Sequence, residues 1–545
     1  MPTLVLGPVL RHVAQHTATV WVETDRAGTV EILGHREPTF SVAGHHYALV
    51  CVRGLEPGGC TPYQVRLDGD VVWPLPGSAD PPSLIRTPDP AHPVRISFGS
   101  CRYASQAAAG GQLPGYGGDA LAMLGRALRQ RPPAEWPDLL LMLGDQVYAD
   151  ETTPGTRARL AARRGTGRPP RGQVADFEEY TWLYAESWTD PDVRWLLSTV
   201  PSAMIFDDHD VHDDWNTSRS WRSDLQATPW WAERITGALM SYWVYQHIGN
   251  LSPEELAADR TYAAVRGSPH AEPVLRAFAQ AADREADGAK GARWSFWRDL
   301  GPTRLVVIDS RCGRILDGRR AMLSKAEQDW ILARLDGDYD HLLIGTSLPW
   351  LMAPALHAVE AWNERMCEHP SAWRRRLGER LRRAGDLEHW PAFHDSFGWL
   401  AGLVADLARG AVGGVRGRRE PPATICVLSG DVHHSYLCEA AYPDAVRSRV
   451  FQVTCSPMFN RVPRPMRVAF RLSWSRAAER ATRLVLGRLA RVPEPPLSWR
   501  RLAGPVHGNA LGSLVLDGRR ALLRIEQPGP GSSVRQAIGY DLTGP

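Results

Sequence analysis

From residue 94 onward, short apolar runs alternate with segments of helical pattern. The apolar runs are typical of buried strands, and they cover residues 94–98, 138–143, 202–206, 304–308, 341–344 and 424–428. Residues 119–130 and 325–335 have a helical pattern, and Ser324 with Glu327 is a capping box for the second. Further β-type runs at 450–453, 511–516 and 521–525 extend the sheet, the last two as a hairpin turning at Asp517-Gly518. The pattern predicts an α/β fold in layers, with β-sheets flanked by helices.

The first 73 residues have a different pattern. Ala18, Val20 and Val22 alternate with polar or aromatic residues, and residues 47–52 form another β-type run, which together suit a small β-sandwich-like domain. Seven prolines then fall between residues 74 and 93, a density that favours a stiff, extended linker. We therefore expect three parts: a β domain at 1–73, a linker at 74–93 and a catalytic domain at 94–545. Such a linker predicts few obligatory contacts between the two domains.

Two stretches fit this scheme less well. Residues 157–171 are basic and rich in Gly and Pro, which favours a mobile surface loop. Residues 466–492 have a helical pattern with many arginines. Its apolar face fits either its own domain or a membrane surface or partner.

Composition narrows the class of protein. An apolar fraction of 43% and a charged fraction of 23% over 545 residues are those of a globular protein with a buried core. The net charge of +3 arises from 63 basic and 60 acidic residues, so no global charge favours nucleic acid. No signal-peptide pattern and no long apolar run are present, and we expect a cytoplasmic protein without a transmembrane segment. The eight cysteines form no C-x-x-C pair, which argues against a disulfide framework or a zinc ribbon.

Polar clusters follow four of the apolar runs directly. Because ligands bind at the carboxyl ends of strands in open α/β sheets, these clusters can meet in one crevice. Taken singly, a Gly-Asp pair after a strand is often only a turn. The four clusters are Ser100-Cys101-Arg102, Gly144-Asp145-Gln146-Val147-Tyr148, Asp207-Asp208-His209-Asp210 and Gly430-Asp431-Val432-His433-His434.

The third and fourth clusters indicate a metal site. Three carboxylates around His209 repel one another unless a cation or several donors hold them. Asp431 and His433 lie two residues apart, an ordinary ligand pairing for a divalent or trivalent ion. His434 is expected to have a supporting or structural role.

Ser-Cys, Gly-Asp-x-x-Tyr, Asp-Asp-His-Asp and Gly-Asp-Val-His-His-Ser, in this order, resemble the motif series of the PhoD-like (alkaline phosphatase D) metallophosphoesterases of the calcineurin-like superfamily. The resemblance implies that Asp145 bridges two metals, with Cys101 and Tyr148 as ligands of Fe(III). It also implies that Asp208 stands where relatives in the family have an Asn ligand, and that Asp431 and His433 complete the site. Calcium is implied as the second metal type, although other divalent ions suit such donors.

The implied activity is hydrolysis of small phosphoesters, monoesters or diesters, by water activated at a multinuclear metal site. His209 matches a His near the scissile ester and is expected to protonate the leaving group or to contact the phosphate. We expect Arg102, which stands where Gln is common, and Trp350 to line the substrate crevice. Asp210 stands where Glu is common.

Two alternatives were weighed. A serine hydrolase using Ser347 lacks the closing glycine of a nucleophile elbow, and Pro349 disfavours the sharp turn that such a nucleophile needs. A catalytically inactive scaffold with the same fold would be expected to have lost ligands, whereas the six predicted metal ligands and His209 are all present.

Overall fold

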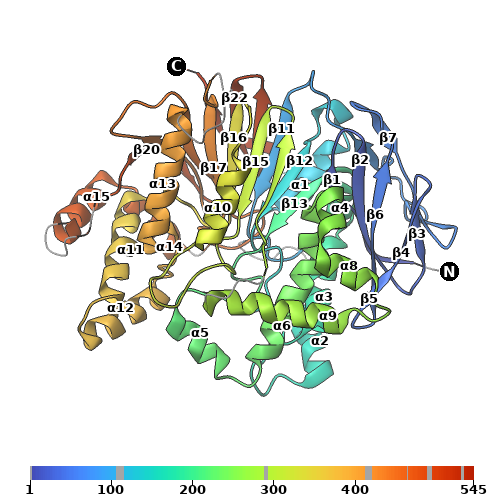
Figure 1. The fold of residues 1–545 in the computed structure, drawn as a ribbon, viewed down its shortest axis with the longest axis horizontal. Helices are drawn as coiled ribbons and strands as arrows, with labels where there is room; N and C mark the ends of the chain where they lie inside the picture. The colour runs from blue at the N-terminus through green and yellow to red at the C-terminus, as the bar shows by residue number, and fades with distance from the viewer. Residues whose placement is uncertain are drawn as a thin grey trace.

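The computed structural model describes residues 3–105, 116–287, 292–410, 420–462, 464–487, 492, 494–529 and 533–544. Two large β-sheets lie at the centre, helices flank them, and a β-rich module formed by the first residues lies at one end of the molecule (Figure 1). The chain is therefore a mixed α/β protein with several sheets, as the sequence pattern predicts.

The first central sheet has six strands, and its first three run parallel. β21 pairs antiparallel with β11 and continues through the hairpin β21–β22, which turns at Asp517-Gly518 as predicted. In spatial order the strands are β13 (Ser202–Ile205), β12 (Leu139–Leu143), β11 (Val94–Gly99), β21 (Leu511–Asp517), β22 (Arg520–Pro528) and β23 (Val534–Asp541).

The second central sheet has seven strands, of which β15, β16, β17 and β19 are parallel. Leu143 of the first sheet lies against Gly345 of the second, and apolar side chains from both sheets form one core. In spatial order the strands are β14 (Phe296–Leu300), β15 (Thr303–Ile308), β16 (His341–Thr346), β17 (Thr424–Ser429), β19 (Arg449–Thr454), β18 (Ser435–Ala441) and β20 (Ser498–Val506).

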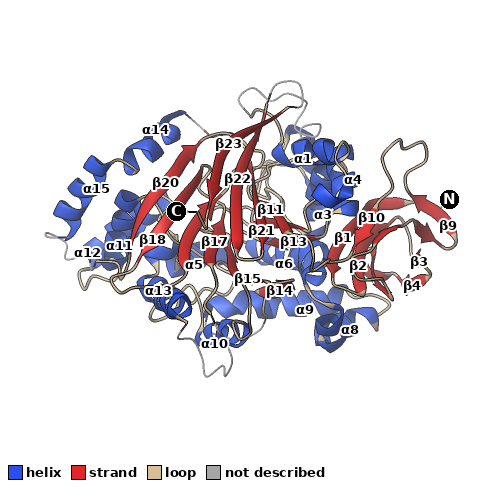
Figure 2. Ribbon diagram, turned by 90° about the horizontal axis from the view of Figure 1, so that it is seen from above, coloured by secondary structure: helices blue, strands red, loops and turns tan. Residues whose placement is uncertain are grey.

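Helices cover the outer faces of both sheets. Ile331 of α10 and Leu400 of α13 pack on the outer face of the seven-stranded sheet, and the figures agree on this placement (Figures 1 and 2). Asp119 caps α1 by accepting from the backbone N–H groups of Leu121 and Ala122. The helices are α1 (Ala120–Leu128), α2 (Pro154–Arg164), α3 (Phe177–Trp188), α4 (Pro191–Thr199), α5 (Arg219–Gln226), α6 (Trp231–Tyr242), α7 (Pro253–Ala258), α8 (Arg260–Arg266), α9 (Glu272–Asp283), α10 (Lys325–Arg334), α11 (Pro354–Cys367), α12 (Ala372–Ala384), α13 (His394–Arg409), α14 (Arg464–Ser473) and α15 (Arg476–Thr482).

Short helical turns join several of these elements. They are η1 (Pro133–Glu135), η2 (Trp243–His247), η3 (Ile248–Asn250), η4 (Arg284–Asp287), η5 (Trp390–Ala392) and η6 (Arg483–Gly487). Among the described residues, the length and hydropathy of every helix fall short of what a bilayer-crossing segment requires.

The N-terminal module contains two four-stranded sheets that share one core, to which Val20 and Val50 of one sheet and Val30 and Val65 of the other contribute. The first sheet is β1 (Leu4–Val13), β2 (Thr17–Thr24), β6 (His45–Arg53) and β5 (Phe40–Val42). The second is β4 (His35–Pro38), β3 (Thr29–Ile32), β8 (Val65–Leu67) and β9 (Asp70–Trp73). A two-stranded pair joins β7 (Cys60–Pro62) to β10 (Leu84–Arg86), which lies within the predicted linker.

The expectation of few contacts between the module and the catalytic part is wrong. Trp21 packs edge-on against Trp188 and also contacts Tyr245, and it belongs to the core of the catalytic part. The Arg11 guanidinium is fully buried and donates to the Gln246 carbonyl and to Asn250 Oδ1. The density of prolines between residues 74 and 93 carried no information about the surfaces on either side of them.

Residues 157–171 also differ from the expected mobile loop. Residues up to Arg164 are helical in α2, because Thr153 caps the helix and Pro154 occupies its first turn, where a missing N–H costs nothing. Arg163 and Arg164 both bind the buried carboxylate of Glu179. The basic residues that suggested a solvated loop thus anchor the helix to α3.

His45 makes the contact between module and catalytic part sensitive to pH. Its ring bonds Glu23 of the module and Glu178 of α3 at 2.8 and 2.7 Å. Burial lowers the pKa of His45, but the two carboxylates more than offset this and raise it to about 9.

We expect His45→Gln to lower the free energy of unfolding by about 1 kcal/mol at pH 6, allowing for the partial exposure of the ring. Because the folded pKa lies above the unfolded value of 6.5, this stabilisation is complete below pH 6.5 and disappears as pH rises through about 9. Urea unfolding of both proteins between pH 6 and 10 measures it, with His92→Gln, an exposed site, as control. A difference that does not change with pH would contradict the interpretation.

Candidate metal centre

The four predicted clusters meet where the two central sheets adjoin. β11 leads into Cys101, β12 into Asp145, β13 into Asp207 and Asp208, and β17 into Asp431. The Cys101 N–H donates to the Gly144 carbonyl at 3.2 Å, and the Asp431 N–H donates to Ser100 Oγ at 3.1 Å. Strand ends separated by more than 300 residues are thus linked directly.

Backbone strain is concentrated in this region. Cys101, Asp145, Asp431 and His433 have φ values of 56°, 51°, 65° and 50°, in the left-handed region that non-glycine residues rarely adopt. Such strain persists only where surrounding structure holds it, and it gathers at functional sites. Four of the six predicted metal ligands are held this way.

Buried carboxylate oxygens that accept no hydrogen bond are the main electrostatic feature of the site. Asp145 Oδ1, Asp207 Oδ2 and Asp208 Oδ1 are buried, and no described residue donates a hydrogen bond to them. Burial, reinforced by the neighbouring aspartates, raises the pKa of Asp145 and of Asp207 well above the usual range. An unpaired buried carboxylate costs several kcal/mol. The oxygens are therefore suited to a cation.

Two trios of residues bring their potential ligand atoms within 4.8 Å of one another. One consists of Asp145, Asp208 and His209, and the other of Asp207, Asp208 and Asp431. Asp208 is common to both. A third trio, Asp214, Asp386 and Glu388, lies in the same part of the chain, but both Glu388 oxygens already bind Arg311 and Arg314.

Tyr148 and Cys101 adjoin the first trio. The Tyr148 hydroxyl donates to Asp145 Oδ2 at 3.2 Å and accepts from Asn460 Nδ2 at 2.8 Å. Cys101 Sγ is fully buried and lies 3.7 Å from the Asp431 carbonyl. Burial, and then the charges of Asp145 and Asp431, raise the pKa of the thiol. A thiolate at this position therefore requires a positive charge beside it.

His209 is held by a residue that the sequence analysis did not identify. Its Nδ1 hydrogen-bonds both carboxylate oxygens of Asp150, at 2.9 and 3.1 Å, and its ring stacks on Tyr148 with centroids 4.5 Å apart. Burial lowers the pKa of His209, but Asp150 and Asp208 more than offset this and raise it well above 6.5. No hydrogen bond joins Nε2 to a described residue, and the raised pKa favours the cationic ring with a proton on both nitrogens.

His433 has the opposite environment. Burial lowers its pKa to about 4, against the opposing charge of Asp431, so its imidazole is neutral. A neutral imidazole is the form that binds metals. His434 points away: its Nδ1 bonds the Val432 carbonyl at 2.7 Å and its Nε2 accepts from Trp474. This is the supporting role expected for it.

Arg311 places a fixed positive charge among the carboxylates. It follows β15, is 0% exposed, and its guanidinium hydrogen-bonds Asp207 and Glu388. The same guanidinium lies 3.3 Å from Asp208 Oδ1 and 3.8 Å from Asp431 Oδ1. The strand-end rule applied to residues 304–308 would have identified it. Because Arg311 is always charged, it balances part of the negative charge whether or not a metal is bound.

His389 is a second residue that the sequence analysis missed. It bonds Asp431 Oδ2 through Nε2 and Glu360 Oε1 through Nδ1, both at 2.8 Å. Burial lowers the pKa of His389, but Glu360 and Asp431 more than offset this and raise it well above 6.5. It precedes a short 3₁₀ turn rather than following a strand, so no sequence pattern marked it.

Arg102 and Trp350 do not join these residues. The Arg102 guanidinium is 1% exposed and donates to Asp119 and Ser187, so it supports the start of α1. Trp350 is 0% exposed and packs against Phe397 in the core on the outer side of the seven-stranded sheet. The geometry gives no support for a substrate contact by either side chain, since both are enclosed by protein.

Asp210, the third carboxylate of its cluster, is structural. It accepts from the backbone N–H groups of Asp145, Gln146 and Asp207 at 2.9 to 3.2 Å. These bonds fix the turn that presents Asp145. Burial raises the pKa of Asp210 to about 7 against their effect.

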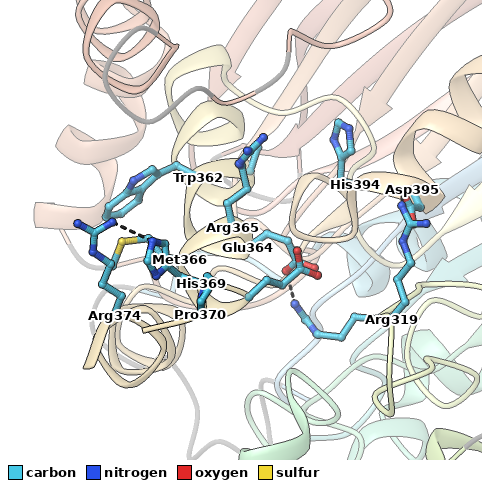
Figure 3. A pocket seen from close by; sticks show the side chains of 13 residues that line it. Arg319, Trp362, Glu364, Arg365, Met366, His369, Pro370, Arg374, His394 and Asp395 are labelled. Atoms are coloured by element: carbon cyan, nitrogen blue, oxygen red, sulfur yellow. Dashed lines mark hydrogen bonds and ion pairs between the residues drawn. The ribbon is translucent and has the colours of Figure 1, made fainter. Parts of the chain in front are cut away.

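A cavity of about 660 Å³ lies elsewhere, between α11, the loop that follows it, the first residues of α13 and the loop at residues 319–320 (Figure 3). Trp362, Met366 and Arg365 line it, and Arg374 points toward His369. None of the residues in the two trios lines this cavity.

Comparisons with known proteins agree with the motif series. A family model described as PhoD-like phosphatase matches residues 120–366, and a domain of unknown function (DUF7800) matches residues 1–85. The resemblance to the PhoD-like phosphatases is thus confirmed. A search of curated proteins finds no significant match.

Solved structures extend the likeness in fold. A structure titled "Structure of PhoD" has 13% identity and a TM-score of 0.57, covering 99% of this chain and 91% of that one. A purple acid phosphatase from yellow lupin (Lupinus luteus) seeds has 10% identity and a TM-score of 0.49, covering 98% and 74%. At this identity the first likeness shows a shared fold.

We predict that Arg311→Met lowers the free energy of unfolding by about 3–5 kcal/mol, because it leaves Asp207 buried without its ion-pair partner and Glu388 with Arg314 alone. Arg311→Lys, which retains the charge but loses the forked geometry, should lose less. Urea unfolding with and without added divalent cation measures both, and the cation should restore part of the loss. Unchanged stability in Arg311→Met would contradict the role given to its charge.

Proposed function

We propose that this chain is a metal-dependent phosphoester hydrolase, acting as a phosphomonoesterase, a phosphodiesterase or both. The observation that carries the proposal is the group of buried carboxylate oxygens of Asp145, Asp207 and Asp208 that accept no hydrogen bond, beside His209, whose pKa is raised. The resemblance to PhoD-like phosphatases supports it independently. We further propose that the layered calcineurin-like fold, with its N-terminal β-sandwich, provides the framework.

The donors present fit metal ions of two kinds. In our proposal, Cys101, Asp145 and Tyr148 hold Fe(III), because thiolate and phenolate donors favour a redox-active trivalent ion over calcium. Asp207, Asp208 and Asp431 offer only carboxylate oxygens, which suit Ca²⁺ or another hard divalent ion. His433, with its neutral ring, completes the set.

Bound ions at such a centre supply Lewis acidity toward the phosphoryl oxygens and make water a better nucleophile at neutral pH. The residues of the chain provide the rest. Asp150 fixes the His209 ring so that Nε2, carrying a proton, faces the substrate and can donate that proton to the leaving alkoxide. Asn460 orients the Tyr148 hydroxyl toward Asp145, and Arg311 keeps Asp207, Asp208 and Asp431 together.

Which carboxylate bridges the ions is open to test. The resemblance implies Asp145, whereas Asp208 is the residue common to both trios. We expect Asp145→Asn to abolish turnover of a chromogenic phosphodiester or monoester and to reduce bound metal. Comparing the metal content of Asp145→Asn and Asp208→Asn identifies the bridge, since only loss of a bridging ligand releases both ions.

His209→Ala serves as the comparison variant. It should keep its metal, and its kcat should fall by a factor of about 10²–10⁴, as expected for a lost general acid. If Asp145→Asn retains full metal and turnover, the proposed hydrolase site is wrong. Metal loss in His209→Ala would make that residue a ligand instead of a proton donor.

Colour tests the proposed iron ligands. A phenolate or thiolate bound to Fe(III) gives charge-transfer absorption, so concentrated protein should absorb visible light. Tyr148→Phe should shift or bleach this band, whereas Tyr103→Phe, whose ring lies beside Tyr148, should leave it unchanged. Colourless, iron-free protein with full activity would rule out the iron assignment.

A further inference from the structure

Large apolar side chains are exposed mainly at one end of the molecule. Among the described residues, 12 large hydrophobic side chains are exposed, and seven of these lie on α12 or on the segment from α14 to η6. Isolated exposed apolar residues are ordinary, but a concentration of them marks an interaction surface. The seven are Trp373 (62%), Leu377 (42%), Leu381 (37%), Val468 (56%), Leu472 (61%), Leu484 (53%) and Val485 (49%).

The α12 residues form a continuous stripe. Trp373, Leu377 and Leu381 are spaced four residues apart, which places them on one face of the helix. The opposite face is fixed to the protein, since Arg382 binds Glu364 of α11. Arginines flank the stripe at exposed positions 374, 375, 376 and 380. The solvent-facing side of α12 thus combines apolar and cationic side chains, while its other side is bound to α11.

The segment from α14 to η6 is built the same way. Its inner face holds Trp474, which packs on Tyr436, and Phe470, which lies over His434 next to the proposed metal centre. Its outer face exposes Val468 and Leu472. Exposed arginines again accompany these apolar residues, at positions 471, 476, 480 and 483.

The two segments occupy the same end of the molecule. α11 contacts α12 as well as α14, α15 and η6, and all lie opposite the N-terminal module in both views (Figures 1 and 2). Residues 372–384 and 464–487 each carry a net charge of +5, whereas the whole chain carries +3. The remainder of the chain is therefore net −7, and the positive charge is concentrated beside the exposed apolar side chains.

We propose that this surface, formed by α12 and by α14 to η6, binds the face of a bilayer that contains anionic phospholipids. Exposed apolar residues combined with arginines are the features of helices that lie in a membrane interface. Anionic headgroups attract the arginines within a Debye length of the membrane, while the apolar side chains enter the acyl boundary.

The other possible occupants fit less well. A second copy of the chain would bring two strongly positive surfaces together, which like-charge repulsion disfavours. A purely electrostatic partner such as nucleic acid would leave Trp373 and Leu472 in water. The proposal does not depend on catalysis, because none of the exposed residues belongs to the proposed metal centre.

Vesicle co-sedimentation of the full chain tests the proposal. Vesicles of phosphatidylcholine alone are compared with an equal mixture of phosphatidylcholine and phosphatidylglycerol. We expect binding to the anionic vesicles, weak binding to the neutral ones, and a decrease as salt shortens the Debye length from about 10 Å at 0.1 M to about 3 Å at 1 M.

Two sets of variants separate the apolar and cationic contributions. The triple variant Trp373→Gln, Leu377→Gln and Leu381→Gln keeps good helix formers and should weaken binding to anionic vesicles at least about tenfold. Arg376→Gln with Arg380→Gln should reduce the preference for anionic over neutral vesicles. Leu332→Gln on α10 and Val71→Gln in the N-terminal module replace exposed apolar residues elsewhere and should bind like the unmodified protein.

Turnover of a soluble phosphoester and the unfolding midpoint should be unchanged in every variant, which establishes that the variants are folded. Failure to bind anionic vesicles at low salt would overturn the proposal, as would equal binding by the triple variant. A stable dimer that dissociates in the triple variant would show that a second copy covers the surface. None of these outcomes would alter the proposed hydrolase activity, which is measured separately.

Discussion

Negative charge that is held away from water is the constraint on which the structure of the site depends. Asp145, Asp207 and Asp208 are nearly buried where the two central sheets adjoin, and Asp431 is only slightly more exposed. Removing each carboxylate from water costs several kcal/mol unless positive charge or hydrogen bonds compensate. Arg311 and His389 supply part of the compensation, and three oxygens still accept no hydrogen bond from the described part of the protein.

The fold meets this constraint by bringing many strand ends to one place. Parallel strands β11, β12 and β13 from one sheet and β15 and β17 from the other all end at the site. The Asp210 carboxylate accepts hydrogen bonds from backbone N–H groups and thereby fixes the turn that carries Asp145. Helix α14 covers His434 with Phe470, so the proposed membrane surface lies on a helix that contacts the residue next to His433.

Features encoded locally in the sequence were predictable. The buried strands, the Ser324 cap of α10 and the β21–β22 hairpin follow from patterns spanning a few residues. So do the strand-end clusters, and with them the convergence of Cys101, Asp145, Asp208 and Asp431.

Features that depend on distant partners were not predictable from one sequence. His389 and Asp150 act through contacts with residues 42 and 59 positions away. Arg102 stands beside Cys101 in the chain, yet its guanidinium turns toward Asp119 and Ser187, which sequence adjacency does not reveal. Trp21 and Tyr47 look like residues of a small β-domain core, but they pack against the catalytic part.

The central claim, that the buried carboxylates hold metal ions which phosphoester hydrolysis requires, is tested most directly by removing those ions. Elemental analysis of the purified protein is combined with thermal unfolding and turnover before and after chelation. The account predicts bound metal in the purified protein, loss of activity and a lower Tm on chelation, and recovery of both when metal is returned. A protein that contains no metal, keeps its Tm in chelator and still hydrolyses phosphoesters would contradict it.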